Sequence, residues 1–489
     1  MKKMIALLLC LCFALGGCAQ SAPIQHTEED GGVTPAPVVA DSPASPAESF
    51  DQLALRLAAL PELPEEPNEE VLWAELGALD RDALGEDGYN EAYDKLWQEF
   101  SAKQDAYYDA VGALRGDGVD DTLTPAFLAY TLRTAELLFD GASEKNVVYS
   151  PANLYLALCM LCETTDGETR AQLLDLLGLS DVEQARDAAN TLWRTLYRDS
   201  ATDKTLLANS IWLNEQFSFR QDTVDRLASD YYASTFRAKM GDRTTDAAIA
   251  EWINENTNHL LENAANGLKT NPDTLMMLIS TLYFKGTWRS QFSEFATEED
   301  VFTAADGTEQ RVDFMHKSVD RGTYYRGDTF TVAYLPFTDG KQMWFLLPDE
   351  GVTLESLLSG EAVDLASLSD PSAAEIRWSV PKFDVDSDLD LIPALKTLGV
   401  TDVFDKSAAD FSPLTELDAV VSAVKHAARV KVDEEGCEAA AFTAISVETT
   451  AMMPERLPVI EMDLNRPFGF LITGVDGLPL FVGAVNTAE

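Results

Sequence analysis

The chain has few basic residues and very few histidines. Its 489 residues include 36 Lys and Arg against 82 Asp and Glu, a formal net charge of −46. This surplus of negative charge repels phosphate groups, which argues against nucleic acid or an anionic lipid surface as a partner. The four histidines, His26, His259, His316 and His426, are too few to predict a metal cluster, so we expect neither a metal nor a cofactor.

Sequence motifs of common enzyme sites are also missing. The chain contains no G-x-S-x-G elbow, no H-E-x-x-H helix, no P-loop and no dinucleotide fingerprint. Each of these would have indicated a nucleophile, a metal site or a phosphate-binding loop. We therefore expect a protein that is not an enzyme.

The N-terminus has an apolar run from Met4 to Leu15 that is too short to cross a bilayer as a helix. It follows two lysines, which predicts an export signal over residues 1–18. The segment ends in Leu-Gly-Gly-Cys and resembles a bacterial lipobox, whose cysteine is acylated. That resemblance implies a lipid anchor at Cys18 on an exported protein at the surface of a bacterial membrane. An ordinary secretory signal cleaved near Ala19, which would leave the protein secreted, is the alternative.

Cysteine is scarce in the rest of the chain. Of six cysteines, Cys10, Cys12 and Cys18 fall within the signal, leaving Cys159, Cys162 and Cys437. The first two of these are three residues apart on a predicted helix without a second pair, which is typical of buried thiols rather than metal ligands. No disulfide framework is predicted.

Two regions of different composition follow the signal. Residues 19–48 are rich in Ser, Thr, Pro, Ala and acidic residues, which predicts a disordered tether. Residues 50–115 carry apolar residues at helical spacing, with Pro61, Pro64 and Pro67 separating the first helices. We expect a small α-helical N-terminal extension, either a bundle or an appendage on the main domain.

The segment from Cys437 to Val447 has the alternation of a half-buried strand. Small or apolar residues occupy one face, and the other face carries Glu438, Phe442 and Glu448. Three consecutive alanines are unfavourable in a permanent strand. The pattern therefore predicts a loop that enters a sheet conditionally, with Gly436 as its hinge.

This segment resembles the proximal hinge of the inhibitory serpins. The resemblance covers Glu434, Glu435, Gly436, Cys437, Glu438, Ala439, Ala440, Ala441 and Thr443, with Cys437 where the family usually has Thr. Further family segments occur in order, among them Asn146–Pro151, Ala208–Trp212, Leu282–Trp288, Ser379–Phe383, Leu398–Phe404 and Asn465–Phe470. They imply a serpin domain over residues 122–489.

The implied fold is α+β. It has a large mixed sheet A, two further sheets, about eight to nine helices and an exposed reactive-centre loop. The implied function is suicide inhibition of a serine or cysteine protease by a monomer, in which the cleaved loop inserts into the main sheet. An inserted strand of 11 residues would be about 36 Å long. A non-inhibitory, anchored serpin-fold scaffold is the alternative.

The family also implies two supporting groups of residues. Glu434 is expected to pair with Lys382 at the top of the sheet, beside Trp288. A latch, or shutter, is expected at Ser150, Asn153, Ser280 and His426, where the usual Asn and one Ser have exchanged places. We expect Asn153 and Ser280 to bond to each other and to His426. A satisfied core histidine is the alternative for His426.

The scissile bond falls in a stretch without basic residues. In the family, the scissile bond usually follows the seventeenth residue counted from the position of Glu434, which here gives the bond Thr450-Ala451. If the loop is longer than usual, the protease would instead cut after Ala451, Met452 or Met453. Small or unbranched apolar residues favour an elastase-like or subtilisin-like protease as the target. Arg456, which would suit a trypsin-like protease, lies further along the loop.

Overall fold

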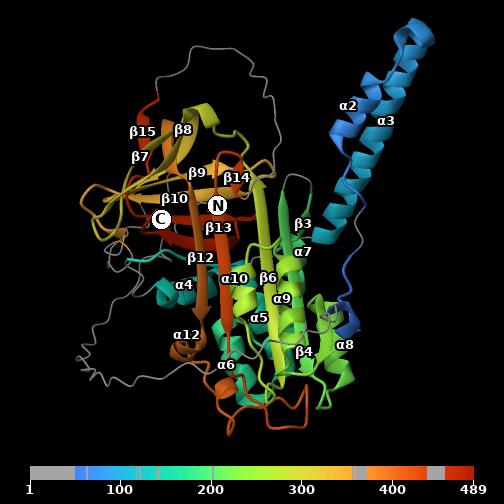
Figure 1. Ribbon diagram of the computed structural model, residues 1–489, viewed down its shortest axis with the longest axis vertical. Coiled ribbons are helices and arrows are strands. Elements are labelled where there is room, and N and C mark those ends of the chain that lie inside the picture. Colours follow the sequence, from blue (N-terminus) through green and yellow to red (C-terminus); the bar gives the residue numbers. More distant parts are fainter. Residues whose placement is uncertain are drawn as a thin grey trace, which may run out of the picture.

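The computed structural model describes residues 50–61, 64–116, 118–119, 123–139, 144–200, 203–354, 357, 372–437 and 457–488. Its helices and strands belong to a mixed α and β body from which one helical hairpin projects (Figure 1). The α-helices are α2 (Glu69–Gly77), α3 (Arg81–Arg115), α4 (Leu123–Phe139), α5 (Pro151–Thr164), α6 (Gly167–Leu177), α7 (Val182–Leu196), α8 (Gln221–Asp230), α9 (Arg243–Asn256), α10 (Glu262–Gly267) and α12 (Ile392–Thr397). Short 3-10 helices lie at η1 (Phe50–Leu53), η2 (Glu294–Ala296) and η4 (Asp402–Phe404).

The large sheet has eight strands in the order β1-β5-β4-β6-β14-β13-β12, with β3 paired to β4. Its two long inner strands are antiparallel, and the short strand β14 lies between β6 and β13. The strands are β1 (Ala54–Arg56), β3 (Arg198–Asp199), β4 (Lys204–Asn214), β5 (Ala233–Ala238), β6 (Met276–Thr287), β12 (Phe383–Asp390), β13 (Lys425–Val432) and β14 (Gly436–Cys437).

The second sheet has nine strands in the order β15-β11-β8-β9-β10-β16-β17-β2, with β7 paired to β8. The 18-residue strand β8 joins what would otherwise be two sheets, because its first part pairs with β7 and its last part with β9. The strands are β2 (Val147–Tyr149), β7 (Thr297–Thr303), β8 (Glu309–Arg326), β9 (Phe330–Pro336), β10 (Gln342–Pro348), β11 (Ser372–Pro381), β15 (Val459–Asp463), β16 (Phe468–Thr473) and β17 (Pro479–Val485).

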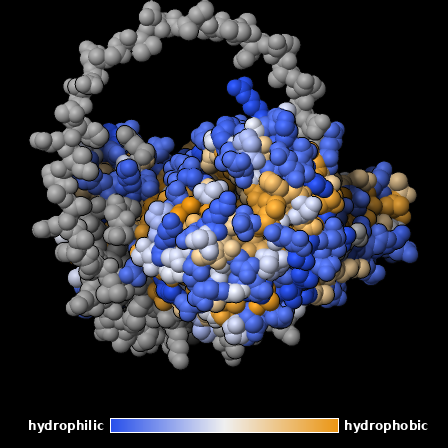
Figure 2. Space-filling model, turned by 90° about the horizontal axis from the view of Figure 1, so that it is seen from below, coloured by the Kyte–Doolittle hydropathy of each residue, from blue (hydrophilic) through white to orange (hydrophobic). Residues whose placement is uncertain are grey.

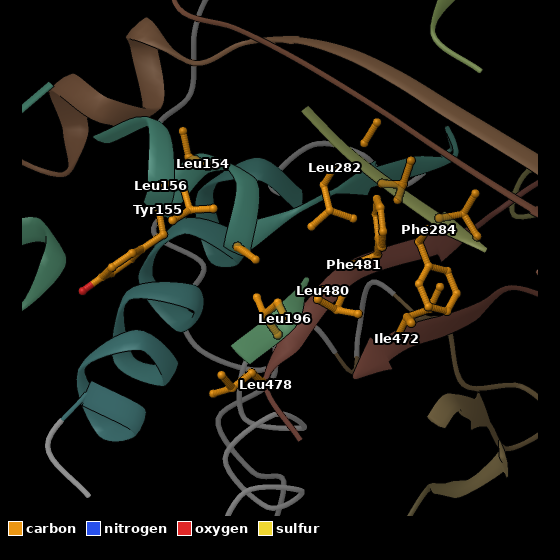
Figure 3. Packing of buried hydrophobic residues seen from close by; sticks show 14 of the residues in the cluster. Leu154, Tyr155, Leu156, Leu196, Leu282, Phe284, Ile472, Leu478, Leu480 and Phe481 are labelled. Carbon is orange, nitrogen blue, oxygen red and sulfur yellow. The ribbon is translucent and has the colours of Figure 1, made fainter. Parts of the chain in front are cut away.

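The core centres on α5, which is buried along nearly its whole length. Ser150 caps the helix by accepting a hydrogen bond from the backbone N–H of Asn153, and Pro151 occupies its first turn. Figure 3 shows side chains from α5 and α7 beside those of β6, β16 and β17, with Leu156, Leu282 and Phe481 among them. The buried helix therefore lies directly behind the strand that borders β14.

The N-terminal extension differs in part from the sequence prediction. Helix α3 is one 35-residue element with a break at Gly85, where φ is +69°. The helical structure predicted from residue 50 onward is wrong just after η1, because Ala54–Arg56 forms strand β1 on the edge strand β5. A free sheet edge with unpaired N–H and C=O groups outweighed the helical spacing of a few leucines.

None of the described helices is both long and apolar enough to pass through a bilayer. Seen from below, the surface is mostly hydrophilic, with hydrophobic residues scattered between (Figure 2). That distribution agrees with the excess of acidic residues in the chain.

Candidate functional site

The candidate site lies where β14 enters the large sheet. Gly436 pairs with Thr287 of β6, and Cys437 pairs with both Gly286 of β6 and Val432 of β13. The sequence predicted that the segment from Cys437 to Val447 enters a sheet with Gly436 as its hinge, and both Gly436 and Cys437 already pair within the sheet. The next residues, Glu438–Arg456, lie outside the described part of the chain.

Below β14 the two flanking strands are not paired with each other. Within the described residues, β6 pairs with β4 on one edge and only with β14 on the other, and β13 pairs with β12 and β14. Residues Met276–Ser280 of β6 are partly exposed, whereas Thr281–Thr287 are buried. The lower parts of β6 and β13 therefore offer facing edges to a further strand (Figure 1).

Glu434 anchors the start of this segment. Its carboxylate lies 2.7 Å from Lys382 Nζ and accepts a hydrogen bond of 2.8 Å from Thr297 Oγ1. Burial raises the pKa of Glu434, but the hydrogen bonds from Lys382 and Thr297 outweigh it, and the net pKa is lowered. The hydrogen bond to Glu434 raises the pKa of Lys382. The expected ion pair is therefore formed, and Thr297 is a partner that sequence reasoning missed.

Trp288 holds the turn before β14. Its indole N–H donates to the carbonyl of Asp433 at 3.0 Å, and its backbone N–H donates to the carbonyl of Glu435 at 2.9 Å. The Asp433 carboxylate accepts from the backbone N–H groups of Glu435 and Gly436. The ring of Trp288 stacks on Phe337 at 4.6 Å between centroids. Trp288 is thus a direct partner of the turn rather than only a neighbour of the ion pair.

The glycine at the start of β14 has a steric cause. A β-carbon on Gly436 would lie 2.0 Å from the carbonyl oxygen of Gly286. Only glycine lets the two strands approach this closely. The sequence predicted a hinge glycine for conformational freedom, but its φ is not in the left-handed region. In this structure, glycine is required at position 436 because the backbones of β14 and β6 approach each other closely.

The buried carboxylate of Asp203 holds β6 at Thr287, the residue that pairs with Gly436 of β14. Asp203 accepts hydrogen bonds from the backbone N–H of Thr287 at 3.2 Å and from Thr338 Oγ1 at 2.5 Å. Burial and the nearby charge of Asp339 raise the pKa of Asp203. Nothing in the sequence pattern separated this aspartate from the many exposed acidic residues.

The four latch residues come together only in part. His426 is buried, and its Nε2 accepts a hydrogen bond from the backbone N–H of Ser150 at 3.0 Å. Burial lowers the pKa of His426 to about 4, so the ring is neutral at pH 7 and carries its proton on Nδ1. The predicted bond between Asn153 and Ser280 is wrong, because the buried hydroxyl of Ser280 has no hydrogen-bond partner among the described residues.

The protein-family comparison matches residues 128–488 to the model described as serpin, serine protease inhibitor. This covers most of the chain. The chain belongs to the serpin family. The predicted α+β serpin fold is therefore confirmed, and serpins are in general protease inhibitors rather than enzymes.

Proteins from a plant and from animals are similar to this chain over most of their length. Serpin-ZX of Arabidopsis thaliana is 27% identical over 364 residues, which is 70% of this chain and 92% of the relative. Iripin-2 of the tick Ixodes ricinus is 30% identical over 377 residues, 74% of this chain and 93% of the relative. Serpin B6 of Pongo abelii is 30% identical over 340 residues, 66% of this chain and 89% of the relative.

Solved structures show the same serpin architecture. The native state of the thermophilic serpin tengpin superposes with a TM-score of 0.66 at 28% identity, covering 76% of this chain and 95% of tengpin. Serpin48 of the insect Tenebrio molitor gives a TM-score of 0.65 at 25% identity, covering 76% of this chain and all of that protein. The family match begins after α3, so the N-terminal hairpin is additional to it.

Several predicted serpin residues lie outside the described residues. These are Cys18, the hinge residues Glu438, Ala439, Ala440, Ala441 and Thr443, and the candidate cleavage residues Thr450, Ala451, Met452 and Met453. Among the residues that the structure does describe, no group of His, Cys, Asp or Glu side chains is arranged to hold a metal ion. Cys159, Cys162 and Cys437 are buried, and none of them forms a disulfide within the part of the chain that the structure describes.

Proposed function

We propose that this serpin inhibits a serine-type protease as a suicide substrate: the protease cuts the loop after β14, and the loop then inserts between β6 and β13. The observation that carries this proposal is the position of β14, which pairs with both flanking strands at the upper end of a boundary that no other described residue occupies. Inserting a strand there would satisfy the backbone groups on both facing edges.

The register of β14 fixes where each inserted residue would lie. Cys437 opposes Gly286 on β6 and Val432 on β13. Each further residue of an antiparallel strand moves one position along both neighbours. Six residues beyond Cys437, Thr443 would therefore lie between Ser280 and His426. Insertion would bring a hydroxyl to the buried, unpartnered hydroxyl of Ser280.

The side-chain alternation of the loop fits that register. Cys437 belongs to the same buried cluster as Leu282 and Phe284 of β6 and Val430 of β13. Residues 439, 441 and 443 would point to that same side, where Ala, Ala and Thr are small enough to pack against the core. Phe442 would point to the other side, on which Met277 and Ile279 pack with residues of α9.

The composition of the loop supports an elastase-like or subtilisin-like target. The candidate cleavage residues Thr450, Ala451, Met452 and Met453 are all uncharged, and Arg456 is the one basic residue between Glu438 and Leu457. An apolar specificity pocket accepts such residues, whereas a trypsin-like pocket with a carboxylate requires a cation. A serpin without inhibitory activity, presenting its hairpin to a partner, is the second candidate.

The test is to incubate the protein without its predicted signal, residues 1–18, with an elastase-type protease. The proposal predicts an adduct that survives SDS, because the acyl-enzyme is trapped before it is hydrolysed. Mass spectrometry of the released C-terminal peptide identifies the cleaved bond. Clean cleavage without any adduct would contradict the inhibitory proposal and favour the non-inhibitory one.

A matched pair of loop variants sharpens this test. Thr443→Arg would bury an unpaired guanidinium beside His426 and should convert the inhibitor into a substrate. Glu448→Arg places the same side chain near the end of the inserted segment and should retain inhibition. If Thr443→Arg still formed the adduct in full yield, insertion in this register would be excluded.

We also propose that Cys18 is acylated and that residues 19–48 tether the serpin to a bacterial membrane surface. The support is the basic and apolar segment that ends in Leu-Gly-Gly-Cys. Labelled palmitate should enter the wild-type protein and not a Cys18→Ser variant, which should also leave the membrane fraction. Equal labelling of both proteins would contradict the anchor.

A further inference from the structure

The hairpin of α2 and α3, residues 69–115, carries more apolar surface than its own packing covers. Leu72, Leu76 and Phe100 form its small core. Trp73 contacts Trp97 edge-to-face at 5.7 Å between centroids and remains 56% exposed. Two helices alone bury only one stripe of each other, so part of the aromatic surface stays open.

The aromatic residues of α3 follow one helical face. Tyr89, Tyr93 and Trp97 are spaced four residues apart, and neighbouring rings lie 6.3 Å and 6.5 Å from each other. Tyr93 and Trp97 pack against the core of the hairpin, and the guanidinium of Arg81 lies 4.4 Å from the centre of the Tyr89 ring, so this face is largely covered. Trp73 of α2, which packs on Trp97, keeps an open side, and a Trp with one open face is among the side chains that most often anchor protein interfaces.

The hairpin is strongly acidic. Residues 69–115 contain twelve Asp and Glu against four Lys and Arg, a net charge of −8. Among the acidic residues next to the aromatic face, Glu86, Glu91 and Asp94 are exposed. This charge repels a second copy of the same hairpin and any anionic surface. It favours a partner with a cationic surface around an apolar recess.

The hairpin is fixed to the serpin body at its base. Arg194 of α7 donates hydrogen bonds to the carbonyls of Leu114 at 2.6 Å and Ala113 at 3.1 Å. Arg115 pairs with Asp476 at 3.3 Å, and Tyr107 is buried. The base is therefore held by several contacts and does not depend on one.

The hairpin extends toward the end of the molecule at which β14 enters the large sheet. From Tyr107 to Glu86 the helix covers 21 residues, about 30 Å at 1.5 Å per residue. Figure 1 shows it rising beside β3 and continuing past the upper end of β6. Cys437, the last described residue before the segment proposed for cleavage, lies at this same end of the large sheet, so a protease that approaches it there would come near this acidic arm.

We propose that the α2–α3 hairpin is a second binding surface for the protease that cleaves the loop, selecting proteases with a cationic, apolar surface patch. This inference rests on the proposed inhibitory function. It adds a preference for proteases with a particular surface charge, which the sequence of the cleaved loop does not determine. The acidic residues increase the rate of encounter, and the exposed side of Trp73 supplies the apolar contact.

The test measures the association rate constant for adduct formation with two elastase-type proteases, one strongly basic and one acidic. The hairpin variant E86Q/E91Q/D94N should lower the rate with the basic protease about tenfold at low salt, and the difference should shrink at high salt. The variant E168Q/E183Q/D187N, which neutralises three exposed residues on α6 and α7, is the matched control and should keep the wild-type rate.

The apolar contact needs its own variant. Trp73→Ala should lower the rate with the basic protease several-fold at both salt concentrations, while circular dichroism shows that the hairpin remains helical. Equal rates for the hairpin and control variants, or an equal loss with the acidic protease, would overturn the inference. So would a dimer in light scattering that Trp73→Ala dissociates. Failure of the wild-type protein to form any adduct would instead contradict the proposed function itself.

Discussion

Lys285 of β6 and Lys431 of β13 lie at the same level of the large sheet, one residue below the point at which Cys437 separates their strands. Both are on the side of the sheet away from the buried cluster that contains Cys437. In the register of β14, the next loop residue is Glu438. Insertion would therefore place one carboxylate between two ammonium groups.

This relationship predicts an electrostatic contribution to the first step of insertion. Glu438→Lys would bring three positive charges together and should slow insertion, so that more of the loop is cleaved without trapping the protease. We expect the stoichiometry of inhibition to rise several-fold. Glu448→Lys makes the same charge change away from these lysines and should leave the stoichiometry near that of the wild type. Equal stoichiometries for both variants would contradict the predicted register.

Ser280 provides a test that separates the intact from the cleaved state. Its hydroxyl has no partner in the described residues of the intact protein, so Ser280→Ala should leave the intact melting temperature nearly unchanged. In the cleaved form the hydroxyl would meet Thr443, and its loss should reduce stability by about 1 kcal/mol. Calorimetry of both forms checks this. A large loss of stability in the intact form would show that the hydroxyl already has a structural role.

His426 predicts a loss of stability in acid. Its pKa is about 4 in the folded protein, against about 6.5 in an unfolded chain. The unfolded state therefore binds the extra proton first as the pH falls, and the stability from the neutral ring, about 3 kcal/mol, is lost between pH 6.5 and 4. Urea titrations of His426→Asn at several pH values should show a flatter dependence over this interval than the wild type. Identical slopes would exclude His426 as the titrating group.

The pair of Glu434 and Lys382 predicts a stabilising contact at the start of β14. Glu434→Gln leaves the half-buried ammonium of Lys382 without its partner and should destabilise the intact protein by about 1–2 kcal/mol. Because the folded-state pKa of Glu434 is lowered, this stability is present above its unfolded pKa and is lost as the pH falls through the folded pKa. A double-mutant cycle with Lys382→Met measures the coupling, and a value near zero would contradict the proposed anchor.

The sequence predicts the conditional strand, but not its extent in the intact protein. The alternation from Cys437 to Val447 identifies which residues can face the core. It does not say which of these residues pair in the intact protein, because that depends on the separation of β6 and β13. Gly436 and Cys437 are the residues of this segment whose pairing the structure describes. The close approach of Gly436 to Gly286 likewise arises from residues 150 positions apart in the chain.

The exchanged latch residues show where residue types mislead. Asn153 and Ser280 preserve the family's set of donors and acceptors, yet the predicted bond between them is absent. Ser150 caps α5 and its backbone N–H binds His426, so the helix cap determines part of the geometry. Hydrogen-bond capacity can be counted in a sequence, whereas distance and direction depend on how α5 packs behind β6.

The most direct measurement is the melting temperature of the protein before and after a single cut in the loop that follows Cys437. The account predicts that the cleaved protein melts more than about 10 °C higher, because a new central strand joins β6 to β13. Equal melting temperatures would contradict the central claim that the cut loop inserts between β6 and β13 as a stabilising strand.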